Sequence, residues 1–283
     1  MTRMAATRDA PLVLRRILPE GYALLTFRHS EVSLEARAGQ FVMLKAGVSP
    51  DLPLRRPFSI MAIDPVESTF TIFVKAVGPS SRALSELRVG APASCTGPLG
   101  RPFRAPALGT TSLLVAGGFG IAPVFLFASE LLRDGRGLRV FYGGRTAKDL
   151  ALQESFGPLG VPLVLATEDG SLGERGQIVG PLRARRADGP EDVALFACGP
   201  GGLLRAVARI GEERRLPVQV SLDPWMGCGI GTCLGCVVPI QAAGEARPHY
   251  KCACTEGPVF DAAAVVWPGE ADSAERREWR ARP

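Results

Sequence analysis

Five cysteines gather toward the C-terminal end of the chain, and their spacing indicates what chemistry they can support. Cys228, Cys233 and Cys236 form a C-x4-C-x2-C run, which Cys252 and Cys254 follow. This spacing is typical of plant-type [2Fe–2S] centres, in which one more cysteine further along completes the ligand set. The glycines beside and between the sulfurs, which let backbone approach a cluster closely, are Gly227, Gly229, Gly231 and Gly235. The sequence therefore predicts one-electron chemistry, with Cys252 or Cys254 as the fourth ligand.

Zinc and structural thiols are the alternatives for the same residues. A structural zinc site commonly uses two short C-x2-C pairs that are well separated. Only one such pair, Cys233 and Cys236, is present in this run, and the x4 gap before it is unusual for zinc. The spacing therefore favours iron–sulfur over zinc.

The composition is that of an ordinary globular protein. The chain has 283 residues, 46% hydrophobic and 22% charged, with a formal net charge of +5. Since domains usually hold roughly 100–150 residues, about two domains are expected. Lysine and arginine are scattered, which argues against nucleic-acid binding. Seven cysteines and an N-terminus without an apolar signal segment favour a reducing compartment, so we expect a cytoplasmic protein.

One uncharged stretch, residues 111–129, is long enough to raise the question of a membrane span. Gly117, Gly118, Gly120 and Pro123 interrupt its middle. A strand, a glycine turn and a helix explain that pattern better, and we expect no membrane span.

The order of the predicted elements indicates the fold class. Short apolar or alternating runs at 22–28, 40–45, 58–63 and 69–77 are separated by turn residues, which predicts a small antiparallel β-barrel. A short helix is expected at 81–87. From about residue 104, predicted strands and helices alternate, which indicates a doubly wound parallel α/β sheet. The predicted strands are 112–116, 137–143, 162–167, 193–198 and 217–221, and the predicted helices are 122–133, 147–154 and 203–213.

These patterns divide the chain into four parts. We expect a small β-barrel at 1–104, a parallel α/β domain at 105–222, a module that holds the cysteine loop at 223–262 and a tail at 263–283. For the charged tail we expect either a short amphipathic helix or a frayed end.

Two glycine-containing turns follow predicted strands and precede predicted helices. In Gly117-Gly-Phe-Gly-Ile-Ala-Pro123, the glycines allow a phosphate to approach backbone N–H groups at a helix start. Cys198-Gly199-Pro200 ends another strand, where α/β proteins bind ligands. The alternatives are an ordinary βα turn and, for Cys198, a small buried hydrophobic residue.

The barrel half contains the short motif Arg56-Pro57-Phe58-Ser59. An arginine can pair with a diphosphate, an aromatic ring can stack on a flavin, and a serine can hydrogen-bond its ring edge. The alternative is the start of a strand with a packed phenylalanine.

In combination, these motifs resemble the ferredoxin–NADP reductase superfamily and, within it, the electron-transfer subunits of class B dihydroorotate dehydrogenases. Arg56-Pro-Phe-Ser59 resembles the R-x-[YF]-S flavin signature, and the segments 73–75 and 78–81 resemble the second and third flavin contacts. The turn that closes the flavin domain of this family has its counterpart at 97–100, and the two nicotinamide motifs have theirs at 117–123 and 198–200. The family's cluster module resembles the segments 228–236 and 254–260. The resemblance covers residues 10 to about 268.

The resemblance implies a set of site residues. Those for the flavin and the nicotinamide are Arg56, Pro57, Phe58, Ser59, Phe73, Val74, Lys75, Gly78, Ser80, Ser81, Gly117, Gly118, Gly120, Pro123, Cys198, Gly199 and Pro200. The implied cluster ligands are Cys228, Cys233, Cys236 and Cys254, which leaves Cys252 as an extra thiol. No residue is expected to act as a catalytic acid or base.

The chain departs from the family pattern at two places. Gly78-Pro-Ser-Ser81 stands where Gly-x-Gly-Thr is usual, although Ser81 keeps a hydroxyl. The segment 221–226 lacks the acidic residue that commonly precedes the cluster's methionine, although Asp223 is nearby. The second departure loosens the link to the dihydroorotate subfamily.

The resemblance implies an oxidoreductase subunit with FAD, a [2Fe–2S] cluster and NAD. NADP stays possible, because an acid in Thr167-Glu-Asp-Gly170 would favour a ribose 2′-OH whereas Arg145 would favour a 2′-phosphate. The implied partner is an FMN-containing dihydroorotate dehydrogenase catalytic subunit of pyrimidine biosynthesis, in a heterotetramer. The alternatives are a small subunit of a sulfur or sulfite reductase, a ferredoxin–NAD(P) transhydrogenase subunit, and a zinc-stabilised nucleotide-binding module without redox activity.

Overall fold

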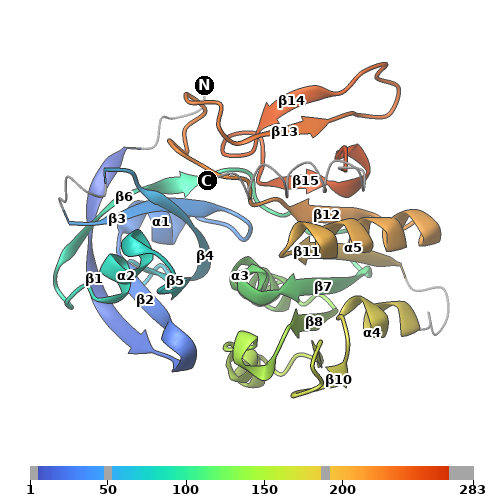
Figure 1. Cartoon of the computed structure of the whole chain (residues 1–283), viewed down its shortest axis with the longest axis horizontal. Helices are drawn as coiled ribbons and strands as arrows, with labels where there is room; N and C mark the ends of the chain where they lie inside the picture. Colours follow the sequence, from blue (N-terminus) through green and yellow to red (C-terminus); the bar gives the residue numbers. More distant parts are fainter. Residues whose placement is uncertain (1–5, 48–52, 186–191, 268–283) are drawn as a thin grey trace, which may run out of the picture.

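The computed structural model describes residues 6–47, 53–185 and 192–267, which form two halves side by side with a smaller cap on one of them (Figure 1). The first half is a closed antiparallel barrel with the strand order β1-β2-β5-β4-β3-β6. Its strands are β1 (Thr7–Ile17), β2 (Tyr22–Arg28), β3 (Phe41–Ala46), β4 (Arg56–Asp64), β5 (Thr69–Lys75) and β6 (Pro92–Leu99). The barrel also carries η1 (Pro19–Gly21) and the short helices α1 (Ser30–Glu35) and α2 (Pro79–Ser85). The predicted barrel is therefore confirmed.

The second half is a seven-stranded sheet with the order β10-β9-β8-β7-β11-β12-β15. All pairs are parallel except the last, in which β15 runs antiparallel to β12. The strands are β7 (Thr111–Gly117), β8 (Leu138–Gly144), β9 (Leu163–Thr167), β10 (Glu174–Arg175), β11 (Val193–Cys198), β12 (Val218–Ser221) and β15 (Val259–Asp261). Its helices are α3 (Ile121–Arg133), α4 (Val179–Ala184) and α5 (Gly201–Arg214), with η2 (Gly118–Gly120) before α3.

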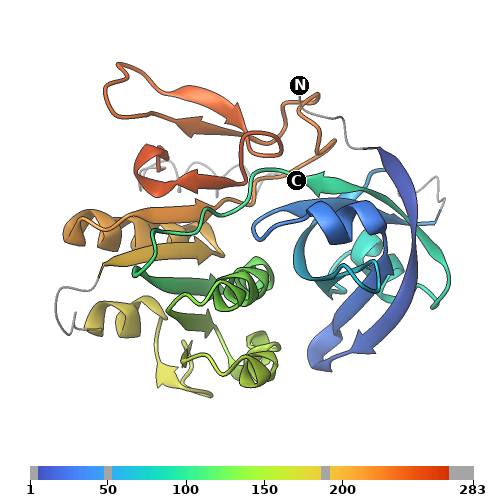
Figure 2. The ribbon, with the colours of Figure 1, turned by 180° about the vertical axis from the view of Figure 1, so that it is seen from behind.

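Helices cover both faces of this sheet, as Figures 1 and 2 show from opposite sides. Along β7, Leu114 and Ala116 belong to the core that contains α3, whereas Leu113 and Val115 belong to the core that contains α4 and α5. This alternation follows from the period of two in a strand that is buried on both faces. The doubly wound α/β class is confirmed.

The predicted helix at 147–154 is wrong. The chain instead forms two 3-10 turns, η3 (Ala147–Asp149) and η4 (Gln153–Leu159). Pro158 lies within η4 and cannot donate a backbone hydrogen bond, and Gly157 precedes it, so an α-helix is not favoured there.

The C-terminal cysteine region forms the cap. The strands β13 (Val237–Ile240) and β14 (His249–Cys252) make an antiparallel hairpin, and η5 (Ala262–Ala264) follows β15. The strand β15 lies within the predicted cluster module yet pairs with β12 of the nucleotide half. This half and the cysteine region therefore share one sheet. Most of the predicted tail lies outside the described residues.

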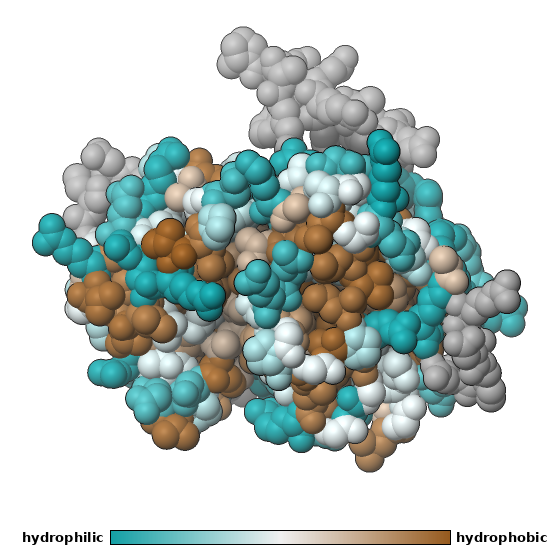
Figure 3. All heavy atoms as spheres, turned by 90° about the horizontal axis from the view of Figure 1, so that it is seen from below, coloured by the Kyte–Doolittle hydropathy of each residue, from teal (hydrophilic) through white to brown (hydrophobic). Residues whose placement is uncertain are grey.

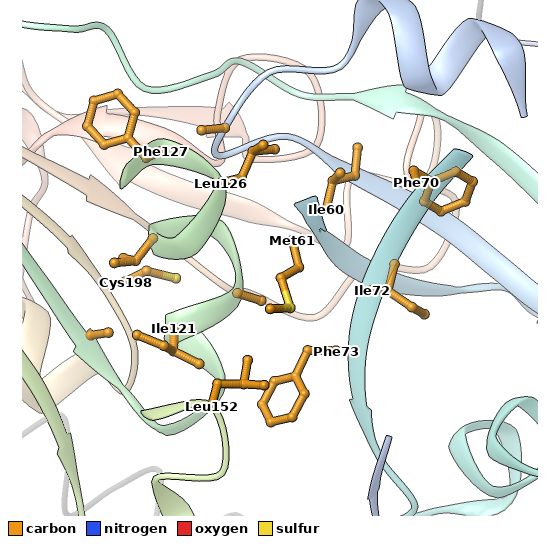
Figure 4. Packing of buried hydrophobic residues seen from close by; sticks show 14 of the residues in the cluster. Ile60, Met61, Phe70, Ile72, Phe73, Ile121, Leu126, Phe127, Leu152 and Cys198 are labelled. Atoms are coloured by element: carbon orange, nitrogen blue, oxygen red, sulfur yellow. The ribbon is translucent and has the colours of Figure 1, made fainter. Parts of the chain in front are cut away.

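The helix α3 fills the space between the two halves. Figure 4 shows Leu126 on the side of α3 that faces Ile60 and Met61 of the barrel, whereas Phe127 lies on the side away from them. These residues belong to one continuous buried core that spans barrel and sheet. Across the same boundary, Lys148 Nζ lies 2.9 Å from Glu20 Oε1.

The surface seen from below Figure 1 is mixed in character. Figure 3 shows apolar side chains gathered near the middle of this face, with hydrophilic ones around them. Among the described residues, no helix combines the length and the apolar character that a membrane crossing requires. The uncharged run 111–129 is a strand, a glycine turn and part of α3, as the sequence predicts.

Candidate functional site

The cysteine loop between β12 and β13 brings the predicted ligands together and directs backbone N–H groups at their sulfurs. The N–H groups of Ile230 and Cys233 donate to Cys228 Sγ at 3.5 and 3.4 Å. The N–H of Gly231 donates to Cys254 Sγ at 3.1 Å, which joins the loop to the turn after β14. Backbone donors around thiolate ligands are a regular feature of iron–sulfur sites.

The thiols interact with one another around the loop. Cys233 interacts with Cys228, and Cys236 interacts with both Cys254 and Cys252. A [2Fe–2S] centre needs two thiolates at each of its two irons, so Cys228 with Cys233, and Cys236 with Cys254 or Cys252, make two pairs that fit its donor requirement. Across the described ranges, no group of three or more His, Cys, Asp or Glu side chains is arranged to hold a metal ion.

The two pairs differ electrostatically. Burial acts to raise the pKa of Cys228, but the N–H groups of Cys233 and Ile230 outweigh it and lower the pKa to about 7. Burial, reinforced by the neighbouring Cys236 thiol, raises the pKa of Cys254 to about 12. Cys228 therefore ionises more readily than Cys254, and a bound metal would have to deprotonate Cys254.

Both candidates for the fourth ligand lie in this site. Cys252 ends β14, faces Val237 in the hairpin register, and lies beside Cys236. Its N–H donates to Glu256 Oε2 at 3.1 Å. The loop amide of Gly231 reaches Cys254, and the structure gives no such contact from the 227–235 loop to Cys252 among the described residues. That contact favours Cys254.

The flavin-motif residues lie on neighbouring barrel strands. Arg56 is exposed at the start of β4, and the other three residues of its motif, Pro57, Phe58 and Ser59, are half-buried. On β5, Phe73 and Val74 are buried, so this strand offers a ligand its backbone and Lys75. Lys75 Nζ donates to Tyr22 Oη at 3.2 Å.

The third flavin motif is the start of α2. Gly78 is the N-cap residue, and Ser80 and Ser81 follow in the first turn. The Ser81 hydroxyl accepts the N–H groups of Val77 and Gly78 at 3.0 and 2.9 Å. Because this hydroxyl is already used in the turn, the backbone N–H groups of the first turn are the donors that remain for a phosphate.

The two nicotinamide motifs pack directly against each other. Cys198 and Ala116 are paired at the carboxyl ends of β11 and β7. A Cβ on Gly117 would lie 2.9 Å from Pro200 Cδ, and one on Gly120 would overlap the backbone of Cys198. Glycine is therefore required at both positions, and the two turns form one surface at the carboxyl edge of the sheet, where α/β proteins bind ligands.

Further residues complete this surface. Gly199 lies against Gly117, while Gly118 has a φ of +52° and open space around it. Pro123 is buried in the first turn of α3, where its missing N–H costs little. Burial, with the nearby Asp223 carboxylate, raises the pKa of the Cys198 thiol to about 12, which keeps it neutral.

The sequence analysis missed an aromatic contact between the flavin and nicotinamide regions. Phe119 is 47% exposed, and its ring centroid lies 5.6 Å from those of both Tyr22 and Phe73. Tyr22 and Phe73 are themselves stacked at 5.1 Å. An aromatic residue inside a glycine-rich turn is the signal that could have indicated Phe119.

The fold and the site define a class of protein, an NAD-linked oxidoreductase with an iron–sulfur module. Residues 114–209 match the oxidoreductase NAD-binding domain, and residues 223–266 match the iron–sulfur cluster binding domain of dihydroorotate dehydrogenase B. The chain is 34% identical to the electron transfer subunit of dihydroorotate dehydrogenase B (NAD(+)) from Desulforamulus reducens, over 90% of this chain and 96% of the relative. It is 35% identical to the same subunit from Bacillus caldolyticus, over 89% of this chain and 95% of the relative. The chain belongs to the family of dihydroorotate dehydrogenase B electron transfer subunits.

Solved structures agree with this assignment. One match is a chain of the NADH-dependent reduced ferredoxin–NADP oxidoreductase, whose structure was described in connection with flavin-based electron bifurcation. The TM-score is 0.79 and the identity 28%, over 99% of this chain and 96% of that one. The ferredoxin reductase of carbazole 1,9a-dioxygenase matches with a TM-score of 0.66 and 24% identity, over 76% and 68%, which shows the fold alone. The predicted resemblance, fold class, oxidoreductase class and cofactors FAD, [2Fe–2S] and NAD are thus confirmed.

Proposed function

We propose that this chain carries electrons between the FMN-containing catalytic subunit of a dihydroorotate dehydrogenase and NAD⁺. The observation that carries the proposal is the near full-length match to the electron transfer subunits, together with a cysteine loop whose amides point at paired thiols. When bound, FAD would exchange a hydride with the nicotinamide and single electrons with the [2Fe–2S] cluster. The protein's task is to hold and orient these groups.

The parts of the chain have distinct tasks in this proposal. Residues 1–104 hold FAD, 105–222 hold the pyridine nucleotide, and 223–262 hold the cluster. Arg56 pairs with the flavin diphosphate, and Ser59 hydrogen-bonds the edge of the flavin ring. The joined turns at 117–120 and 198–200 place the nicotinamide. Cys228, Cys233, Cys236 and Cys254 ligate iron.

The surface around the cysteine loop supports docking of a partner there. Trp225 is 86% exposed, and Leu234, the residue after the exposed Cys233, is 60% exposed. Ile230 and Tyr250 add exposed apolar area on the same cap. Exposed aromatic side chains are frequent anchors of protein interfaces. We infer that the catalytic subunit covers this loop, in a heterotetramer in the cytoplasm.

NAD is the proposed nucleotide, with NADP as the alternative. Glu168 and Asp169 are exposed just after β9, at the carboxyl edge of the sheet. A carboxylate there favours a ribose 2′-OH and repels a 2′-phosphate. Arg145 follows the end of the neighbouring strand β8 and is also exposed. Its guanidinium could pair with a 2′-phosphate, which is why NADP is the alternative.

The experiment that tests the proposal is anaerobic purification with analysis of the visible spectrum, iron, sulfide, zinc and flavin. We expect about two irons per chain, as a [2Fe–2S] centre requires, together with FAD. The reconstituted pair should then reduce NAD⁺ with dihydroorotate. Zinc without flavin would contradict the proposal.

Two observations favour a second candidate function. The ferredoxin–NADP oxidoreductase chain matches over nearly the whole length, and the segment before Met226 lacks the acid usual in the dihydroorotate subfamily. The partner would then be a larger ferredoxin-dependent subunit. Two assays with the cofactor-loaded chain separate the two functions. If reduced ferredoxin reduces the chain in the presence of the larger subunit, and dihydroorotate does not reduce it in the presence of the catalytic subunit, the second function is favoured.

A further inference from the structure

The barrel strand β3 is buried on both of its faces. Val42 and Leu44 point into the barrel core, as expected for alternate residues of a barrel strand. Phe41 and Met43 point outward, yet they are only 3% and 1% exposed. What covers them is the core that contains Met226, Cys236, Cys252 and Cys254 of the cysteine region. The cysteine region therefore packs on the outside of β3.

The closest approach is between the cluster loop and Met43. Gly229, the residue after Cys228, has a φ of +76°, and a Cβ built on it would lie 2.5 Å from Met43 Cγ and 3.0 Å from Met43 Sδ. Leu99 of β6 closes the same space at 3.3 Å. The loop can thus lie against the barrel only because residue 229 has no side chain, and Met43 defines where it rests.

The register of the barrel brings two residues of the flavin motif, Pro57 and Ser59, to the same face as Phe41 and Met43. In the antiparallel pair β3–β4, Phe41 is opposite Ser59 and Met43 is opposite Pro57. Residues directly opposite in such a pair point to the same side of the sheet, with Cβ atoms about 4.5–5.5 Å apart. The serine proposed to hydrogen-bond the flavin therefore shares one face with the two side chains on which the cluster loop rests.

We propose that Met43 is a positioning residue that holds the cluster loop at a defined place on the barrel face that carries Ser59. This inference rests on the proposed function, since it gives the contact by which the two redox sites are held close. In the test NADH would be the reductant: with FAD bound, the C4–H bond of NADH would break as an N–H bond forms on the flavin, and of the two electrons gained the flavin would pass one to the cluster and keep the other. Met43 is not itself oxidised or reduced. It affects electron transfer only because its contact with Gly229 sets the position of the cluster loop.

The test uses the full-length chain purified with its cofactors. Met43→Ala removes the support, and Gly229→Ala pushes the loop away from it. For Met43→Ala we expect FAD and iron contents like those of the wild type, whereas Gly229→Ala also strains a backbone with a φ of +76° and is compared with the double variant, which carries the same strain. The electron paramagnetic resonance spectrum of the reduced cluster should change. Cluster reduction by NADH should slow severalfold, because the rate of electron transfer falls as the distance between the flavin and the cluster grows.

Three further variants separate positioning from simple damage to the core. Met43→Leu keeps the volume and should behave like the wild type. Gly229→Ala combined with Met43→Ala restores space for the new Cβ, so the double variant should reduce its cluster faster than Gly229→Ala alone. Leu44→Ala truncates the next residue of the same strand on the barrel side, and should lower stability with the spectrum and the reduction rate unchanged.

Two outcomes contradict the inference in different ways. If Met43→Ala keeps the wild-type spectrum and rate, or slows no more than Leu44→Ala, Met43 does not position the loop. If the wild-type chain lacks FAD or iron, or NADH cannot reduce its iron centre, the proposed function is contradicted. The inference about Met43 is then contradicted as well, because it rests on that function.

Discussion

The nicotinamide turn and the cluster loop are both rich in glycine, but their glycines serve different purposes. In the turn, Gly117 and Gly120 leave no room for a Cβ because the second nicotinamide motif fills that space. In the loop, Gly229 and Gly231 have φ values of +76° and +81°, which place backbone amides around the sulfurs. One set of glycines joins two motifs into one surface, which we propose binds the exchangeable nicotinamide. The other set lets the loop wrap closely around its sulfurs, where we propose the resident cluster is held.

The two regions also differ in what lies around them. Residues 117–120 and 198–200 lie at the carboxyl edge of the sheet, where Phe119 contacts Tyr22 and Phe73 of the barrel and the Cys198 thiol is buried and neutral. The cluster loop lies on a cap with Trp225 and Leu234 exposed. We infer that the turn was shaped for a small molecule and that the loop keeps one side open for a protein.

The largest effect is expected at the cluster. Cys233→Ser removes one of four thiolates, and we expect loss of the cluster's visible absorbance and of electron transfer to the partner. FAD should stay bound, because its proposed contacts lie in the barrel. Iron, flavin and absorbance measured on one anaerobic preparation check this. Cluster content like that of the wild type would remove Cys233 from the ligand set.

The next effect is expected at the flavin site. Arg56→Ala removes a charge-assisted pair to the diphosphate, which should weaken FAD retention by ~1.5–3 kcal/mol. The flavin-to-protein ratio after gel filtration, compared with that of Arg55→Ala, measures this. Arg55 is a suitable control because its guanidinium bonds Ser94 Oγ at 2.8 Å. Equal flavin content in the Arg56 variant and the wild type would exclude the role.

Two substitutions in one turn test the purpose of its glycines. Gly120→Ala forces a methyl group into the backbone of Cys198 and should lower the free energy of unfolding by about 1–3 kcal/mol, with weaker NADH binding. Gly118→Ala meets open space, and only its φ of +52° is strained, so about 1 kcal/mol is expected. Urea unfolding and the KM for NADH measure both. A larger effect at Gly118 than at Gly120 would contradict this account.

The protonation of the loop thiols provides a smaller, pH-dependent test. In protein freed of iron, Cys228 should react with iodoacetamide increasingly as the pH rises through about 7, because the loop amides stabilise its thiolate. Cys254 and Cys198, whose pKa burial raises to about 12, should stay unreactive at neutral pH. Mass spectrometry of digested protein over pH 6–9 locates the label. Preferential labelling of Cys254 would contradict this assignment.

The repetitive features of the fold could be predicted from the sequence, while features that depend on contacts between distant segments could not. Alternating runs indicated the barrel, and strands alternating with helices indicated the parallel sheet, because both periods are local. The four apolar residues of β3, Phe41–Leu44, indicate burial on two faces, but only the structure identifies the cysteine region as the second cover. The pairing of β15 with β12 likewise depends on where a three-residue strand arrives.

The smallest effect is expected at Cys252, the position that spacing alone could not separate from Cys254. Both thiols lie beside Cys236, so neither their spacing along the chain nor their closeness to Cys236 identifies which of them is the fourth ligand. The difference is the Gly231 amide, which donates to Cys254 Sγ from inside the loop. Cys252→Ser should therefore keep wild-type iron content and absorbance, whereas Cys254→Ser should lose both. If Cys252→Ser loses the cluster and Cys254→Ser keeps it, the ligand is Cys252 and the Gly231 amide serves a thiol outside the cluster.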